Sequence, residues 1–269
     1  EQSRGGATSD PRSWASDRQT ERRKQKENKK KGKDAALTVV SQNFNGIMNE
    51  EQLDEAHLSM KKLGVGIMCG QEGRRPTTSM TRWDTEELLI AFEEPGAQQG
   101  NMKKDGCFFL LSAKWKDAYV RGGKQRRRYC PRLVTIRVPL QQGGNLYLVN
   151  VHCPDDSKAP AVILAFQQLL EQALDDAQPG DITLLIGDTN ACTGTAGDYD
   201  DGVCGEHGST YLNEAGDNLR RVMASHQMAD LLTWEPQTMN TSFFDHRTGR
   251  AKQLDRAFMH RYLRHLVRK

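Results

Sequence analysis

The sequence predicts an α/β protein in which short apolar strands alternate with amphipathic helices, and three observations support this fold class. Continuous apolar runs such as residues 184–186 are typical of buried strands. Between such runs lie longer segments with apolar residues at helical spacing, of which residues 159–177 are the clearest. The apolar runs end in polar residues, which predicts a functional site gathered along one edge of the sheets.

The first half of the chain contains four predicted strands and one predicted helix. Residues 37–46 form a β-branched strand that ends in Asn-x-Asn-Gly, and residues 51–62 have helical spacing. A second strand at residues 65–69 runs into Gly-Gln-Glu. Strands at residues 86–92 and 107–112 follow, joined by a polar loop that contains glycine.

The second half continues the alternation. Residues 133–138 and 146–151 alternate apolar and polar residues, and the Gln-Gln-Gly-Gly between them predicts a hairpin turn. The remaining predicted elements are the helix at 159–177, the strand that ends at Asp188, a long polar loop at 192–213, a helix at 216–226 and a strand at 254–259.

Charge is unevenly distributed along the 269 residues. Residues 1–34 hold eleven basic and six acidic residues, a net charge of +5, whereas the whole chain carries +3. We therefore expect residues 1–35 to be a disordered basic tail and residues 36–269 to form a mildly acidic domain. The tail either solubilises the chain, binds nucleic acid or a protein partner, or directs the chain to the nucleus.

Two further features exclude other classes of protein. No run approaches the roughly 18–20 apolar residues of a membrane span, so we expect no membrane insertion. The six cysteines form no Cys-x-x-Cys pair and several lie in strand-like runs, which predicts buried free thiols. These features favour an intracellular protein, nuclear rather than cytoplasmic.

The strand at residues 184–186 breaks at Gly187 into Asp188-Thr189-Asn190. Asp188 and Asn190 are two residues apart and therefore lie on the same side of an extended backbone. A carboxylate and a carboxamide suit a hard cation and a phosphate. The alternative is ordinary turn chemistry, in which Gly-Asp simply opens a turn.

Four other predicted strands also end in polar residues with oxygen or imidazole chemistry. These residues are Asn43 with Asn45, Glu72, His152 and Asp255. Each has an ordinary alternative: a turn former, a solvated strand end, a hydrogen-bonded structural histidine, or an ion-pair partner for the neighbouring Arg256. Five such strand ends are unlikely to coincide by chance, so we predict that they form one site.

These motifs carry a resemblance to a known family. Ser-Gln-Asn-Phe-Asn-Gly, Gln-Glu, Val-His-Cys-Pro, Gly-Asp-Thr-Asn-Ala and Gln-Leu-Asp occur in this order between residues 41 and 255. The series resembles the signature of the endonuclease/exonuclease/phosphatase superfamily, over residues 37–259. The resemblance implies a four-layer α/β sandwich of two packed mixed sheets with a metal-dependent phosphodiesterase site at their shared edge.

Secondary motifs are similar to the endonuclease domains of LINE-type retrotransposons and their domesticated relatives. They are Gly-Glu-His-Gly at 205–208 with Asn-Glu-Ala-Gly at 213–216, Asn-Thr-Ser-Phe-Phe at 240–244, and the run at 106–112. This similarity implies DNA as the partner, with RNA as the alternative substrate.

The resemblance also implies a role for each polar strand end. It assigns Glu72 as the principal ligand of Mg²⁺ (or Mn²⁺), Asn43 as its assistant, Asp188 as the group that orients or deprotonates water, Asn190 and His152 as phosphate contacts, and Asp255 as the carboxylate that orients a catalytic histidine. Asn45 is a weaker candidate for a substrate contact. Arg128 and Tyr129, in a basic run, are further candidates near the substrate groove, with a solvated hairpin edge as the alternative.

The sequence departs from the family at its closing motif. The family ends in Ser-Asp-His, which supplies the catalytic histidine and the last strand a couple of dozen residues after the Leu-Asp pair. Here fourteen residues follow Asp255, and neither His260 nor His265 is preceded by Ser-Asp. We therefore expect the last strand to be absent, either because the chain is a fragment of an active enzyme or because it descends from one and has lost catalysis.

Three functions remain open from the sequence. The first is a Mg²⁺-dependent DNA endonuclease of retrotransposon type. The second is a non-catalytic nucleic-acid-binding or scaffold protein that keeps the fold. The third is a phosphatase of small molecules, which the mildly acidic domain favours less.

Overall fold

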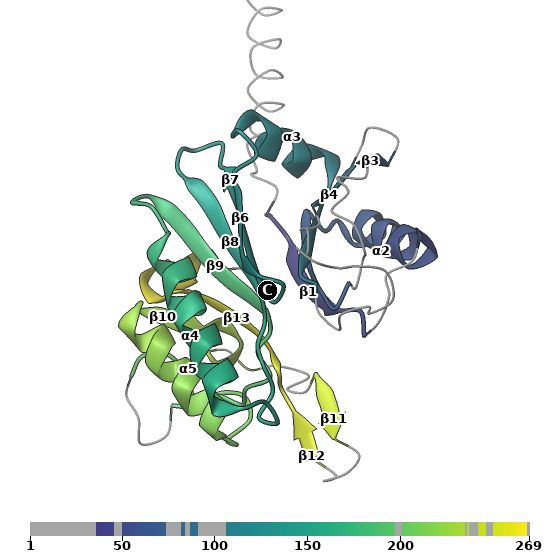
Figure 1. Ribbon diagram of the computed structural model, residues 1–269. Coiled ribbons are helices and arrows are strands. Elements are labelled where there is room, and N and C mark those ends of the chain that lie inside the picture. Colours follow the sequence, from purple (N-terminus) through teal and green to yellow (C-terminus); the bar gives the residue numbers. More distant parts are fainter. Residues whose placement is uncertain are drawn as a thin grey trace, which may run out of the picture. The chain divides into compact units, whose positions relative to one another are not determined.

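A computed structural model of the chain describes residues 36–45, 50–73, 82–83, 87–90, 106–196, 201–234, 236, 242–245 and 250–267. The predicted tail at residues 1–35 lies outside the described residues. Residues Leu37–Lys269 form one compact unit (Figure 1). No helix in the described part of the chain is long and apolar enough to cross a lipid bilayer.

One sheet has five strands in the order β1-β2-β5-β4-β3. Its strands are β1 (Val39–Asn43), β2 (Ile67–Gln71), β3 (Arg82–Trp83), β4 (Glu87–Ile90) and β5 (Phe108–Leu111). β1 and β2 are parallel and are connected through helix α2 (Glu50–Leu63), whereas the other neighbours are antiparallel. Because β1 and β2 are parallel, they end at the same edge of the sheet, which places Asn43 and Glu72 together.

The other sheet has six strands in the order β10-β13-β9-β8-β7-β6. Its strands are β6 (Arg126–Cys130), β7 (Leu133–Pro139), β8 (Asn145–His152), β9 (Asp181–Asp188), β10 (Met228–Asp230) and β13 (Asp255–His260). β8 and β9 are parallel and joined through α4 (Pro160–Asp175), with His152 opposite Asp188. β13 is antiparallel to β9 and begins at Asp255, which is also opposite Asp188.

The two sheets pack face to face, and helices cover their outer faces (Figure 1). The core between the sheets contains side chains such as Phe109 of β5 and Ile136 of β7. α4 and α5 (Glu214–Ser225) cover the six-stranded sheet, and α2 packs on the five-stranded sheet. This arrangement confirms the predicted α/β sandwich of two mixed sheets flanked by helices.

Gly187 allows β9 to approach β8 closely just before the functional residues. Its φ is +150°, and a Cβ atom at this position would lie 2.0 Å from the carbonyl oxygen of Val151. Only glycine tolerates this combination of dihedral angle and contact. The Gly-Asp pair therefore serves strand packing as well as chemistry.

Several elements differ from the sequence prediction. The sequence does not predict helix α3 (Ala113–Arg121). Its apolar face is formed by Trp115, Ala118 and Tyr119, and the charged residues between them obscure the helical spacing of these apolar residues. β11 (Phe243–Asp245) and β12 (Arg250–Lys252) form a separate two-stranded ribbon. Among the described residues, β1 has one strand neighbour, β2, so it lies at an edge of its sheet.

The cysteines are as the sequence predicts. All six are free thiols, and all except Cys130 are buried. Burial raises the pKa of Cys192 and of Cys204, the latter to about 11. These thiols are therefore protonated at neutral pH and pack as small apolar side chains.

Candidate functional site

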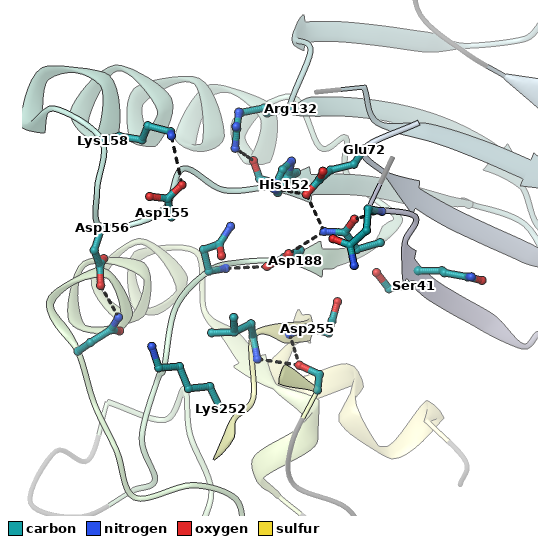
Figure 2. A pocket seen from close by; sticks show the side chains of 17 residues that line it. Ser41, Glu72, Arg132, His152, Asp155, Asp156, Lys158, Asp188, Lys252 and Asp255 are labelled. Carbon is teal, nitrogen blue, oxygen red and sulfur yellow. Dashed lines mark hydrogen bonds and ion pairs between the residues drawn. The ribbon is translucent and has the colours of Figure 1, made fainter. Parts of the chain in front are cut away.

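A polar cavity of about 750 Å³ lies at the edge where β1, β2, β8 and β9 end and β13 begins (Figure 2). It is lined by Ser41, Gln42, Asn43, Asn45, Glu72, Arg132, His152, Asp155, Asp156, Lys158, Asp188, Asn190, Asn213, Ser242, Lys252, Leu254 and Asp255. Both sheets contribute residues, and the lining includes each of the five polar strand ends that the sequence singled out.

The carboxamide of Asn43 connects the two sheets at the centre of this site. Its Nδ2 donates to Glu72 Oε1 at 3.1 Å and to Asp188 Oδ2 at 3.0 Å. The backbone amide of Asn45 donates to Asn43 Oδ1 at 2.9 Å, which fixes the orientation of the carboxamide. Asn43 therefore holds two carboxylates from different sheets within a few ångströms of one another.

His152 lies next to this carboxylate pair. Its Nε2 is 3.6 Å from Glu72 Oε1, and its side chain is almost buried. The parallel register of β8 and β9 places His152 beside Asp188. An imidazole at this position can donate a hydrogen bond to an anion bound in the cavity.

Asn190 is held in a sharp turn that follows Asp188. Its backbone amide donates to Asp188 Oδ1 at 3.0 Å, and its Nδ2 donates to the carbonyl oxygen of Cys153 at 2.8 Å. The amide nitrogen carries two hydrogens, so one remains for a ligand. Asn190 is thus positioned between the β8 and β9 strand ends.

Three residues of the site have left-handed backbone conformations. The φ angles are 50° at Asn45, 55° at Glu72 and 47° at Asn190. Asparagine tolerates this region better than most residues, but glutamate does so rarely. Such conformations cost about 1–3 kcal/mol each and concentrate at functional sites, so the Glu72 backbone supports a functional role for this strand end.

Asp255 completes the acidic edge. The backbone amides of Leu254 and Asp255 donate to Ser242 Oγ at 2.9 and 3.0 Å, which anchors the start of β13. Burial raises the pKa of Asp255, and the neighbouring Asp188 carboxylate raises it further, whereas the Ser242 hydroxyl opposes the shift. Two adjacent carboxylates at a half-buried edge favour a cation between or beside them.

The donor set suits a hard cation. The described residues contain no group of three or more histidine, cysteine, aspartate or glutamate side chains placed to hold a metal ion by themselves. Mg²⁺, however, keeps several waters and needs only one or two protein carboxylates. Glu72, Asp188 and Asp255 offer carboxylate oxygens around one cavity, with no cysteine in its lining, so the residues present fit such an ion.

Three cationic residues of the cavity were not predicted. Arg132 lies in the turn between β6 and β7 and donates to the carbonyl oxygens of His152 and Cys153 at 3.4 and 3.3 Å. Lys158 pairs with Asp155 at 3.3 Å, and Lys252 lies at the end of β12 (Figure 2). Arg132 comes just before β7, which pairs with β8. This position beside the His152 strand end is the one sign in the sequence that Arg132 belongs to the site.

Arg128 and Tyr129, the weaker candidates for substrate contacts, are not among the residues that line the cavity. Tyr129 packs on the side of the six-stranded sheet that faces α4, and its hydroxyl contacts Asp176 and Tyr147. Arg128 pairs with Val134 in the β6–β7 ladder and therefore lies on the opposite face. Alternation along β6 thus turns Tyr129 away from the site.

His260 is also remote from the site. It ends β13, five residues after Asp255, and at about 3.4 Å per residue the two are roughly 17 Å apart. His265 follows in the 3₁₀ helix Arg261–Leu266. Neither histidine lines the cavity, so neither supplies an imidazole to it.

A buried pair of amide side chains supports the site from behind. Gln71 Nε2 donates to Asn150 Oδ1 at 2.8 Å, and both residues are fully buried. Asn150 Nδ2 donates to the carbonyl oxygens of Gly70 and Phe108 at 3.0 and 2.8 Å. These bonds join the two sheets one residue before Glu72 and two residues before His152.

Replacing Asn150 with leucine is expected to lower the free energy of unfolding by roughly 1–3 kcal/mol, because three buried hydrogen bonds are lost: the one from Gln71 Nε2 and the two that Asn150 donates to the carbonyl oxygens of Gly70 and Phe108. Urea unfolding followed by circular dichroism measures the loss. Asn145→Leu, at the half-buried start of the same strand, is the matched control and should cost less. Equal losses in the two variants would contradict a special role for the cross-sheet pair.

Comparisons with known proteins agree with this fold. No family model and no curated protein matches the sequence. An AP endonuclease from Leishmania major has a similar structure, with a TM-score of 0.60, 13% identity, and coverage of 85% of this chain and 80% of that one. An endonuclease/exonuclease/phosphatase family protein from Leptotrichia buccalis has a TM-score of 0.54 at 13% identity, covering 84% and 88%.

A 3′ phosphatase from Neisseria, solved with a product DNA hairpin, has a TM-score of 0.52 at 10% identity, with coverage of 86% and 89%. At these identities the likenesses establish the fold alone, an α/β sandwich that this chain shares with the three solved structures.

Proposed function

We propose that this chain is a metal-dependent phosphodiesterase. The observation that carries the proposal is the Asn43 carboxamide, which joins the Glu72 and Asp188 carboxylates across the two sheets beside His152 and Asn190. More particularly, we propose a DNA endonuclease of the LINE-type retrotransposon kind. The secondary sequence motifs support the retrotransposon kind, and solved structures named as AP endonucleases and a DNA-hairpin complex support DNA as the substrate.

The residues of the cavity have complementary roles in this reaction. Glu72 and Asn43 would hold Mg²⁺, or Mn²⁺ in its place, which supplies a positive charge to the phosphoryl oxygens. Asp188 accepts the proton of the attacking water, whose oxygen forms the new bond to phosphorus as the bond to the leaving oxygen breaks. Asn190 and His152 donate hydrogen bonds to the phosphoryl oxygens. The leaving oxygen takes a proton from solvent water, and Asp188 returns its proton to the solvent.

A second candidate is a nucleic-acid-binding protein without catalysis. It is favoured by the position of His260, which ends β13 and does not line the cavity, so this histidine supplies no imidazole to the site. In that function the cavity would bind a phosphate group without breaking the ester. The two candidates differ in one measurable respect, the cleavage of DNA.

A plasmid-nicking assay distinguishes them. We expect relaxed plasmid in the presence of Mg²⁺ or Mn²⁺, no nicking after chelation with EDTA, and strongly reduced nicking by Glu72→Gln, because the amide loses the anionic oxygen that binds the ion. Glu171→Gln, an exposed glutamate on α4, is the matched control and should nick normally.

The outcomes separate the candidates. Nicking that persists unchanged in Glu72→Gln or in EDTA would disprove the assigned site. Absence of nicking, with DNA binding retained, would favour the non-catalytic candidate.

A further inference from the structure

α3 and the start of β6 form a strongly basic surface outside the cavity. We call it the α3–β6 basic surface; its cations are the exposed side chains of Lys114, Arg121, Lys124 and Arg126. Over residues 113–130, all of which are described, Asp117 is the single acidic residue. Of the basic run at residues 126–128, Arg126 therefore belongs to this surface, whereas Arg127 faces α4 together with Tyr129.

The fold of α3 explains why the charges face outward. Ala118 and Tyr119 are buried, and Trp115 packs against the core between the sheets. Lys114 and Arg121 are seven residues apart and so share one face of the helix, and both are exposed. The inward face of α3 thus packs against the core, and Lys114 and Arg121 lie on its exposed face.

A tight turn fixes Lys124 beside the end of the helix. Gly123 and Lys124 have φ angles of 81° and 56°, which reverse the chain into β6. The hydroxyl of Tyr119 donates to the carbonyl oxygen of Lys124 at 3.0 Å, and the backbone amide of Lys124 donates to the carbonyl oxygen of Tyr119 at 3.1 Å. Arg126 is close enough to Tyr119 to lower its pKa, against the larger upward effect of burial.

Much of this charge is not neutralised. Lys114, Arg121 and Lys124 make no ion pair within the part of the chain that the structure describes. Two neighbouring cations lie outside this surface: Lys116 is largely buried and pairs with Asp117 at 3.8 Å, and Arg127 pairs with Asp176 on the side that faces α4. A concentrated positive surface on a domain of net charge near −2 attracts polyanions electrostatically.

The surface is separate from the cavity. β6 runs from Arg126 to Cys130, and Arg132, which lines the cavity, follows two residues later. At about 3.3 Å per residue, Arg126 and Cys130 at the two ends of β6 are roughly 13 Å apart, and Arg132 lies in the turn beyond Cys130. A ligand held by both the cavity and this surface would therefore have to be an extended polymer.

We infer that the α3–β6 basic surface binds the phosphate backbone of duplex DNA outside the cavity. Each lysine or arginine side chain that contacts a phosphate neutralises it and displaces its counterions. Such contacts do not depend on the base sequence. A membrane surface fits less well, because an interfacial helix needs a broad exposed apolar face and that face of α3 is buried. The choice of DNA as the polyanion rests on the proposed function. The attraction of this surface to polyanions in general rests on its charge alone.

The test is DNA binding by the full chain as a function of salt. The triple variant Lys114→Gln, Arg121→Gln, Lys124→Gln is compared with the unaltered protein on a fluorescent 30-base-pair duplex, in EDTA so that no cleavage occurs. Each lost phosphate contact should reduce the slope of log affinity against log salt by about 1, so the slope should fall by about 3 and the affinity roughly tenfold.

A matched triple variant controls for net charge. Lys61→Gln, Lys62→Gln and Arg221→Gln remove three exposed cations from α2 and α5 and should leave the slope nearly unchanged. Asp117→Asn should tighten binding, because it removes the one carboxylate of the surface. Thermal unfolding of each variant verifies that the fold is retained.

The inference is overturned if the first triple variant binds the duplex with unchanged affinity and slope, or if the control triple variant loses as much. It is also overturned if the first triple variant loses binding to anionic phospholipid vesicles or polyglutamate while its DNA binding is unchanged. Because binding is measured without cleavage, a chain that fails to nick but shows the expected slope would contradict the proposed catalysis and support this surface.

Discussion

Asp188→Asn is expected to reduce the rate of DNA nicking by about 10²–10⁴-fold, the contribution typical of a positioned general base. The carboxamide has the same shape and can still accept the 3.0 Å hydrogen bond from the backbone amide of Asn190. It cannot take a proton from water, and its oxygen is a weaker partner for a cation. Single-turnover nicking in excess Mg²⁺ measures the rate.

The control for this variant is Asp175→Asn, at an exposed position on α4 remote from the cavity. Circular dichroism spectra and thermal unfolding of both variants should match those of the unaltered chain. If Asp188→Asn nicks at the normal rate, Asp188 is not the base, and the role passes to another cavity carboxylate such as Asp255.

Arg256→Met is expected to lower the free energy of unfolding by about 3–5 kcal/mol, the cost typical of removing one partner of a buried ion pair. Arg256 Nη1 lies 2.7 Å from Asp230 Oδ2, and both side chains are completely buried. Asp230 also accepts a hydrogen bond from Thr193 at 3.0 Å. Without Arg256 the Asp230 carboxylate is left in the core with no counterion.

The loss in Arg256→Met should depend on pH. Burial already raises the pKa of Asp230, and removing the guanidinium, which lowers it, raises the pKa further. A carboxyl group whose pKa is higher in the folded than in the unfolded state stabilises the fold at low pH and loses that contribution as pH rises. Urea unfolding should therefore show a larger loss at pH 8 than at pH 5.

A double variant separates the ion pair from simple packing. Arg256→Met with Asp230→Leu removes both charges, and apolar replacements of buried pairs are often nearly neutral. The double variant should therefore recover most of the stability lost by the single one. If it is as unstable as Arg256→Met alone, lost packing rather than the unpaired carboxylate causes the effect.

The strand ends of the site were predictable because their chemistry is local. Asp188 and Asn190 stand at the end of an apolar run, and Glu72 and His152 end two others. The contact between Asn43 and Asp188, 145 residues apart, depends on how two sheets pack, which a pattern in the sequence does not contain. Order along the chain suggested one site, whereas the bonds that form it required the fold.

Other features were missed for physical reasons that are equally specific. The sequence suggests Arg256 as a partner for the adjacent Asp255, but neighbours on a strand point to opposite faces, and Arg256 pairs with Asp230 in the core. Arg132 belongs to a turn, where no hydrophobic period marks a functional side chain. The charge of Arg128 and the ring of Tyr129 suggest substrate contacts, but the sequence does not show toward which face of β6 each side chain points.

The hydrogen bonds from Asn43 to Glu72 and Asp188 can form only when both sheets are folded and packed together. The chain from Asn43 to Asp255 must be arranged in both sheets before Glu72 and Asp188 meet, and such distant contacts form slowly during folding. A cation bound at that junction would stabilise the folded state by mass action and resist separation of the sheets. Amide hydrogen exchange in β1 and β9 should therefore slow together when Mg²⁺ is added, although the two strands belong to different sheets.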